Sequence, residues 1–206
     1  KIIEGLKTHK ATITKKIFSR ELKFKDENYN YYPDWETKCI GEIFKITRGN
    51  VLPMNLIKPN YNKGISYPVY SSQTKNKGLV GYYKDYLFEN SITWTTDGAN
   101  AGDVNYRLGK FYCTNVCGVL INQDGYCNIC VAELINSVSK NYVSYVGNPK
   151  LMNGVMSEIK ITFPSIQEQI KISNFLLKLD EKINFETKLL TQYENQKKYL
   201  LQNLFV

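Results

Sequence analysis

Histidine is almost absent from this chain, and so are the motifs on which most enzymes depend. The 206 residues contain a single histidine, His9, so no Ser/His or Cys/His pair for nucleophilic catalysis can form in the central part of the sequence. There is no G-x-G-x-x-G motif, no Walker loop, no metalloprotease helix motif and no Asn-Pro-Pro-Tyr-type motif of adenine methyltransferases. We therefore expect no catalytic residues and no cofactor.

The chain also lacks long apolar runs and an even number of cysteines. No 18 consecutive apolar residues occur, which argues against a membrane-spanning helix. Five cysteines without a recognisable signal peptide indicate reduced thiols and a cytoplasmic protein. Four of them have the spacing C-x3-C…C-x2-C of a tetrahedral zinc site: Cys113, Cys117, Cys127 and Cys130. Because Cys117 opens a core-like run and buried free cysteines are common, we predict no metal site, with zinc as the alternative.

Acidic residues are missing from one long stretch. The net charge is +8, and residues 45–84 carry seven Lys/Arg and no Asp/Glu, although residues 24–163 as a whole carry fourteen basic and twelve acidic residues. A block of one sign inside a balanced domain indicates a surface that faces an anionic partner. A chance run on a solvated surface is the alternative.

One acidic segment invites comparison with nucleases. Pro33-Asp34 is followed by Glu36-Thr37-Lys38, which matches the letters of the PD…ExK motif. The metal site of that motif needs its two acidic elements on separate strands. Here the two elements nearly touch in the sequence, so we reject a nuclease.

The C-terminal part, residues 164–206, predicts one long helix. Ser165 and Glu168 fit a capping box, and no Gly or Pro follows Pro164. Alternating steps of four and three give a heptad seam, interrupted by Glu186 and Lys197. Its apolar and aromatic members are Ile172, Leu176, Leu179, Ile183, Leu190, Tyr193, Leu200 and Leu204. Such a helix would be roughly 60 Å long, so we expect the seam to meet another helix, the alternative being a helix that lies on its own domain.

Residues 1–19 predict a second helix with a related seam. The stripe of Ile3, Leu6, Ile13 and Ile17 is interrupted by Lys10. The stripe recurs at an offset of 187, polar interruption included, in the pairs Ile3/Leu190, Leu6/Tyr193, Lys10/Lys197, Ile13/Leu200 and Ile17/Leu204. A repeat with the period of a domain plus a helix predicts a fragment that holds the tail of one copy and a complete second copy.

Between the two helices the pattern is that of short strands separated by Gly/Asn/Asp turns. We predict strands at 39–47, 67–71, 79–83, 91–95, 111–113, 118–121 and 159–163, and a short helix at 128–138. The result is an α+β fold with a substantial sheet. Three parts are predicted: residues 1–23 as the end of a preceding helix with a linker, residues 24–163 as a globular domain, and residues 164–206 as the long helix.

The candidate binding residues lie in the loops of the basic block and in a second polar loop. Lys and Arg neutralise phosphates, and Asn, Gln and Arg make paired hydrogen bonds to base edges. The block supplies Arg48, Lys58, Asn60, Tyr61, Lys63, Ser72, Gln73, Thr74, Lys75, Asn76 and Lys77, and the second loop with its flank supplies Thr96, Asn100, Asn105 and Arg107. For the second loop, a glycine-rich turn that serves only the path of the chain is the alternative.

Four segments carry a resemblance to a known family. They are YPDWE at residues 32–36, YPVYSS at 67–72, DGANAG at 97–102, and FPSIQEQ at 163–169 with its continuation through 175–176 and 179–183. The first three are similar to the target-recognition domains, and the last to the conserved spacer helix, of the specificity subunit of type I restriction–modification enzymes. The resemblance covers essentially the whole chain and matches one half of such a subunit.

This resemblance implies a function and partners. In that family the subunit is not catalytic; two recognition domains read two DNA half-sites, and two antiparallel long helices set the distance between them. It implies a curved β-sheet domain that recognises one half-site of double-stranded DNA, a coiled-coil spacer helix and a short helical stub. The implied partners are methyltransferase subunits, nuclease/translocase subunits through them, and the other half or a second copy in a homodimer. The alternative is a coiled-coil scaffold whose globular domain binds a protein.

Overall fold

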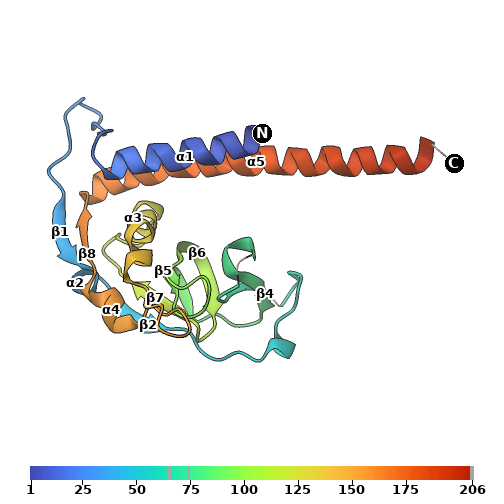
Figure 1. The fold of residues 1–206 in the computed structure, drawn as a ribbon, viewed down its shortest axis with the longest axis horizontal. Coiled ribbons are helices and arrows are strands. Elements are labelled where there is room, and N and C mark those ends of the chain that lie inside the picture. Colours follow the sequence, from blue (N-terminus) through green and yellow to red (C-terminus); the bar gives the residue numbers. More distant parts are fainter. Residues whose placement is uncertain (65, 74, 205–206) are drawn as a thin grey trace. The chain divides into compact units, whose positions relative to one another are not determined.

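The computed structural model describes residues 1–64, 66–73 and 75–204. It divides the chain into two compact units, one of Lys1–Tyr32 with Lys171–Val206 and the other of Pro33–Ile170 (Figure 1). The α+β class predicted from the sequence, with a helical stub, a curved sheet and a long last helix, is confirmed. Within the described ranges, no helix has both the length and the apolar character needed to cross a bilayer.

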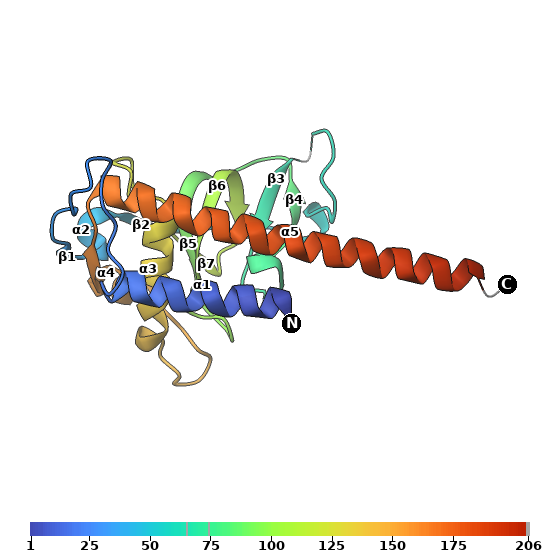
Figure 2. The same cartoon turned by 90° about the horizontal axis from the view of Figure 1, so that it is seen from above.

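The first unit is a pair of antiparallel helices. The helix α1 (Ile2–Phe18) lies beside the first half of α5 (Ile166–Leu204), as two views show (Figures 1 and 2). Lys10, the polar interruption of the α1 stripe, meets Asp180, with 2.7 Å between Nζ and Oδ1. The rings of Phe24 and Phe175 make an edge-to-face contact with centroids 5.8 Å apart. The amphipathic stripe of α1 is therefore used against α5.

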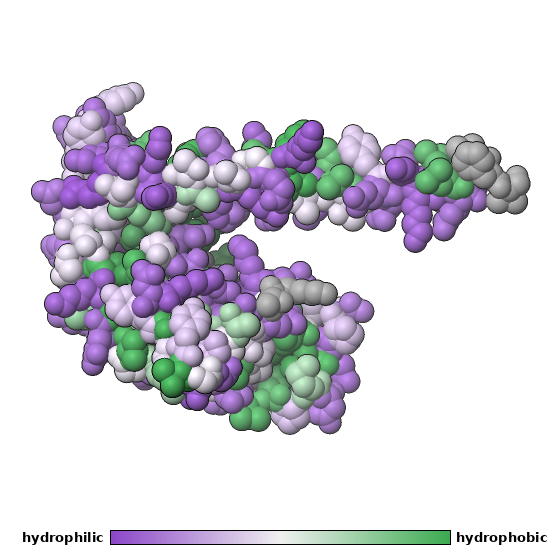
Figure 3. Space-filling model, in the orientation of Figure 1, coloured by the Kyte–Doolittle hydropathy of each residue, from purple (hydrophilic) through white to green (hydrophobic). Residues whose placement is uncertain are grey.

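The seam of α5 changes from buried to exposed along the helix. Ile172 and Leu176 are fully buried, and Leu179 and Ile183 are half-buried. Leu190, Tyr193 and Leu200 are exposed, at 47%, 60% and 44%. Figure 3 shows hydrophobic and hydrophilic side chains mixed along the C-terminal part of the helix. Leu204 ends α5, and its side chain lies outside the described structure.

The second unit contains a two-stranded ribbon, β1 (Glu36–Cys39) paired antiparallel with β8 (Lys160–Phe163). The strand predicted at 39–47 is interrupted, because a helical turn, α2 (Ile40–Ile43), separates β1 from β2 (Lys45–Arg48). The turn is stabilised by the Glu42 carboxylate, which accepts the N–H of Cys39, and by the full burial of Ile40. A further helix, α4 (Asn153–Glu158), packs beside α2, in a part of the chain where no helix is predicted from the sequence.

A six-stranded sheet forms the body of this unit, in the order β2-β7-β5-β6-β3-β4. Its other strands are β3 (Tyr67–Tyr70), β4 (Leu79–Tyr83), β5 (Phe88–Thr95), β6 (Val104–Cys113) and β7 (Cys117–Ile121), and α3 (Ile129–Ser139) packs against β6. All neighbours are antiparallel except β3 and β6. The sheet curls so strongly that Phe111 and Cys113 of β6 share a core cluster with Cys117 and Val119 of β7, although β5 lies between the two strands.

This curl brings several strand ends together. The N–H of Gly49, just after β2, donates to the carbonyl of Cys117 at 3.0 Å, and that of Asn50 donates to Cys113 at 3.2 Å. The N–H of Thr114 donates to the carbonyl of Tyr70, the last residue of β3, at 2.9 Å. The loops that leave β2, β3 and β6 therefore start from one place.

The core holds Trp94 in a slot with no spare room. The indole is 1% exposed and its N–H donates to the carbonyl of Leu151 at 2.9 Å. A Cβ added to Gly118, on the neighbouring strand β7, would lie 2.1 Å from the Trp94 ring. We expect Gly118→Ala to lower the free energy of unfolding in urea by at least about 1–3 kcal/mol through overpacking. Gly154→Ala is the matched control, because nothing lies within 4 Å of its added Cβ, and it should cost nothing.

Candidate nucleic-acid interface

The loop between β3 and β4 turns through a left-handed conformation. Asn76 and Lys77 have φ of 51°, and Gly78 has φ of 88°. Asn tolerates this region better than most residues, and Gly78 is required because an added Cβ would lie 2.6 Å from the Ser71 carbonyl. The Ser71 N–H donates to the Gly78 carbonyl at 2.8 Å and closes the loop. Asn76 and Lys77 thus sit exposed on a tight turn.

Two other predicted residues, Gln73 and Ser72, lie in the first part of this loop. Gln73 is exposed, and its side-chain amide donates to the Leu79 carbonyl. Ser72 is half-buried and offers its carbonyl to the next loop. Thr74 lies outside the described residues, as does the side chain of Lys75.

The loop between β5 and β6, residues 96–103, lies against the β3–β4 loop. Its Asn100 side chain donates to the Ser72 carbonyl at 2.9 Å. On its other side it pairs with the segment at 144–150, because the Gly98 N–H donates to the Pro149 carbonyl and Asp97 forms a β-bridge with Lys150. Lys150 is exposed and was missed by the sequence analysis, since only this long-range pairing brings it to the surface in question.

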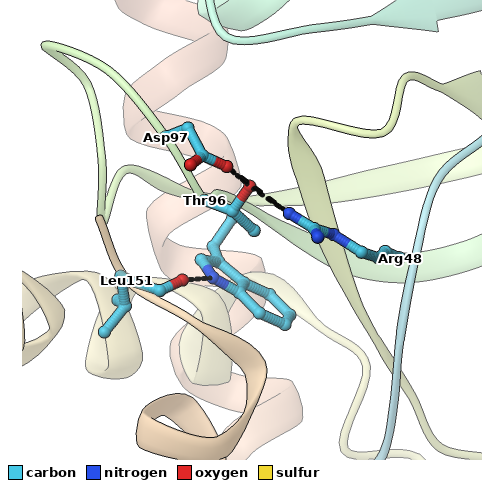
Figure 4. A network of polar contacts seen from close by, with 5 residues as sticks. Arg48, Thr96, Asp97 and Leu151 are labelled. Atoms are coloured by element: carbon cyan, nitrogen blue, oxygen red, sulfur yellow. Dashed lines mark hydrogen bonds and ion pairs between the residues drawn. The ribbon is translucent and has the colours of Figure 1, made fainter. Parts of the chain in front are cut away.

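Arg48, at the end of β2, joins the same surface. Its guanidinium donates to the Thr96 hydroxyl at 3.1 Å and to the Asp97 carboxylate at 3.4 Å (Figure 4). The Thr96 hydroxyl in turn donates to Asp97. Arg48 retains 40% side-chain exposure, so it is held in place and still reaches solvent. Its pairing with an acidic neighbour weakens the positive field at this point.

A second basic group lies along the outer edge of the sheet. Lys58 pairs with Tyr82 of β4 through two backbone hydrogen bonds of 2.9 and 2.8 Å. The Tyr61 ring packs edge-on against Tyr82, with centroids 6.0 Å apart. The side chains of Lys58, Asn60, Tyr61 and Lys63 are all exposed. The predicted basic block is thus divided between the clustered loops and the segment at 58–63, which lies beside the edge strand β4.

Two predicted site residues lie in the interior. Thr96 is 0% exposed and Arg107 is 7% exposed. Both are predicted from the sequence to face DNA, Thr96 in the second polar loop and Arg107 on its flank. Instead, Thr96 is buried where that loop begins, and residues 104–113 form β6, which points Arg107 into the sheet. Asn105, also on β6, is half-buried. We propose that Thr96 and Arg107 support the surface instead of touching DNA.

The cysteines lie in different surroundings. Cys113, the last residue of β6, and Cys117, the first residue of β7, are buried in one core cluster. Cys127 donates to the Leu120 carbonyl at 3.6 Å, and Cys130 is buried in α3. Burial raises the pKa of Cys117 to about 11 and raises that of Cys113 further, so both thiols stay protonated at neutral pH. Among the described residues, no three His, Cys, Asp or Glu side chains lie close enough to hold a metal ion.

The segment that matches the nuclease letters lies on β1. Glu36 and Lys38 form an exposed ion pair, with 2.8 Å between Oε2 and Nζ. The hydrogen bond from Lys38 lowers the pKa of the Glu36 carboxyl, and the same bond raises the pKa of Lys38. Glu36 and Lys38 therefore pair with each other on the surface of the ribbon.

Removing the acidic neighbour of Arg48 should strengthen binding to any polyanion. We expect Asp97→Asn to steepen the log–log salt dependence of binding to random-sequence duplex DNA by up to about 0.9, because Arg48 becomes free to take one phosphate. Asp124→Asn, which removes an exposed carboxylate from the turn after β7, is the matched control and should leave the slope unchanged. Equal slopes for all three proteins would place Arg48 and Asp97 away from DNA.

Comparison with known proteins identifies the family. The model of the type I restriction modification DNA specificity domain matches residues 32–195. The chain belongs to this family. It is 41% identical over 144 residues to S.MpnORF289P N-terminus, a type I specificity subunit sequence of Mycoplasma pneumoniae, with 68% of this chain and 75% of that one covered. The MpnII specificity subunit of the same organism is 34% identical over 174 residues, which cover 81% of this chain and 52% of the relative.

Solved structures of type I subunits share the fold. The S subunit of Mycoplasma genitalium superposes with a TM-score of 0.73 at 20% identity, over 99% of this chain and 55% of that one. The HsdS subunit of Thermoanaerobacter tengcongensis superposes with a TM-score of 0.54 at 12% identity, over 91% and 47%. This specificity-domain chain therefore spans about half the length of these two subunits.

Proposed function

We propose that this chain recognises one half-site of a bipartite target in double-stranded DNA, as part of the specificity subunit of a type I restriction–modification enzyme. One observation carries the proposal: the curl of the sheet gathers polar and basic loops into a single exposed surface, within a chain of the specificity-domain family. The residues proposed to face DNA there are Arg48, Gln73, Asn76, Lys77, Asn100 and Lys150. Lys58, Asn60, Tyr61 and Lys63 extend this surface along the edge of β4.

Phosphate contacts and base contacts are assigned to different residues. Lysines act as flexible point charges, so Lys58, Lys63 and Lys77 are proposed to neutralise phosphates. The side-chain amides of Gln73 and Asn76 carry a donor and an acceptor side by side, which suits the paired donor and acceptor of adenine in the major groove. The recognition domain is proposed to span residues 24–163.

The long helix is proposed to act as spacer and docking element. Residues 164–206 carry an exposed seam, with Leu190, Tyr193 and Leu200 open to a partner. We propose that this seam pairs antiparallel with the helix of the other half or of a second copy, the latter giving a dimer of about twice 23.8 kDa. Methyltransferase subunits, and nuclease/translocase subunits through them, are the further partners. Catalysis is proposed to reside in those subunits.

Selection from a random duplex pool tests the proposed function. We expect the purified chain to enrich one short contiguous motif, or an inverted repeat of that motif where two copies pair. Methylation mapping of DNA modified by the complete enzyme that carries this domain should return the same half-site. Weak binding without enrichment, or no binding to DNA, would contradict the proposal and favour a protein-binding scaffold.

A further inference from the structure

Arg107 is a cation buried among neutral groups. Its guanidinium carbon lies 3.7 Å from the centroid of the Tyr70 ring, which is stacking distance. Its Nε donates to the Thr93 hydroxyl at 3.0 Å, and one terminal nitrogen donates to the Lys77 carbonyl at 2.7 Å. Among the described residues, no carboxylate lies within ion-pair distance of it.

Stability alone does not account for this residue. Burying a cation without an opposite charge is costly, and an apolar side chain of similar volume is commonly as stable or more so at such a position. The cost is visible here, because burial lowers the pKa of Arg107 below its ordinary value. The guanidinium is therefore expected to serve a purpose that a methionine or leucine would not serve.

The function of the guanidinium follows from the Lys77 carbonyl to which it donates. Lys77 is the second of two consecutive non-glycine residues with φ of 51°, a left-handed conformation that is unfavourable for residues with a Cβ. A hydrogen bond from a charged donor is about twice as strong as a neutral one, and it meets the strained turn at its last carbonyl before Gly78. The other side of the loop is tied by Ser71, whose hydroxyl is 2.9 Å from that of Thr114.

We propose that Arg107 is a positioning residue that holds the left-handed turn of Asn76 and Lys77 in the orientation needed to read DNA. As far as DNA is concerned, this inference rests on the proposed function. The arrangement places a rigid guanidinium, stacked on Tyr70, behind a loop whose exposed side chains are polar. Sequence preference then depends on a side chain that never touches a base, because residues that bind a ligand must be held in position by the residues packed behind them.

The first test needs no DNA. Hydrogen–deuterium exchange is measured on peptides covering residues 71–79 in the full chain, as wild type, Arg107→Met and Arg107→Lys. We expect exchange at the Ser71 amide to rise about tenfold or more in both variants, since lysine keeps the charge but cannot stack and bind two acceptors at once. Lys110→Met is the matched control. It removes a cation from the same strand that lies over the Tyr86 ring, 4.5 Å from its centroid, and it should leave the loop unchanged.

The second test separates positioning from direct contact. On random-sequence duplex DNA the salt slope should be the same for wild type and Arg107→Met, which removes the charge, while the motif enriched from a random pool should weaken at several positions. A slope lower by about 0.9 would mean that Arg107 takes a phosphate, which overturns the inference. Unchanged exchange in the loop overturns it as well. If the wild type enriches no motif, the proposed function fails, and the exchange result still decides whether Arg107 holds the turn.

Discussion

Changing Lys58, Lys63 and Lys77 together to glutamine is expected to reduce the log–log salt slope of DNA binding by roughly 2.7, at about 0.9 for each phosphate contact. The three side chains are exposed and belong to the block at 45–84, which carries no acid to offset them. Because phosphate contacts carry no sequence information, affinity should fall to a similar degree for every duplex. Fluorescence anisotropy over a range of salt concentrations measures both effects.

The control variant removes the same charge elsewhere. Lys15, Lys16 and Lys160 are exposed and lie outside the block, and their change to glutamine also lowers the net charge by three. If the effect comes from local contacts, this variant keeps a slope close to that of the wild type. Equal losses in both variants would mean that only the overall charge of the protein attracts DNA, and the block would no longer define an interface.

Removing residues 1–19 is expected to make association between two copies at least about tenfold tighter. In the structure α1 occupies the first half of the α5 seam, with Lys10 paired to Asp180. The sequence repeat at an offset of 187 gives the C-terminal half of α5 the same stripe, with Lys197 in the place of Lys10. The tail of a second copy would therefore need the site that α1 fills, and freeing that site raises the population competent to pair. Light scattering over a dilution series measures the change.

Two variants of the truncated chain test the register. Leu190→Asp with Leu200→Asp puts charges into the tail and should return the protein to a monomer. Non-specific hydrophobic association through the uncovered Ile172 and Leu176 would instead persist in this variant. Asp180→Lys should also break the pair, and the added change Lys197→Asp should restore it by exchanging the two charges. A truncated chain that stays monomeric would show that the seam is kept for a different partner.

The long-range order of the sheet is where the prediction from sequence was weakest. From the sequence, β4 is predicted at its observed bounds and the ends of β3 and β7 are predicted to within one residue, because turn residues flank each strand. Residues 104–110 of β6 are not predicted as strand, since Asn105 and Arg107 look like loop residues. The parallel pairing of β3 with β6 gives Arg107 a buried place beside Tyr70, and a pairing of that kind leaves no local signal.

The sequence by itself determined the two helices and the charge of the binding surface. Helical periodicity, a capping serine and the absence of Gly and Pro are local properties, so α1 and α5 appear at Ile2–Phe18 and Ile166–Leu204, close to the predicted ranges. The run of basic residues without acids is likewise a property of the chain alone. Only the tertiary structure decided which polar residues face outward. The curl of the sheet brings Arg48 to the loops at 71–78 and 96–103, and the bridge to Asp97 brings Lys150 there. Arg107 points inward because side-chain direction follows strand register, which is set by pairing between distant segments, and Thr96 is buried at the start of the 96–103 loop.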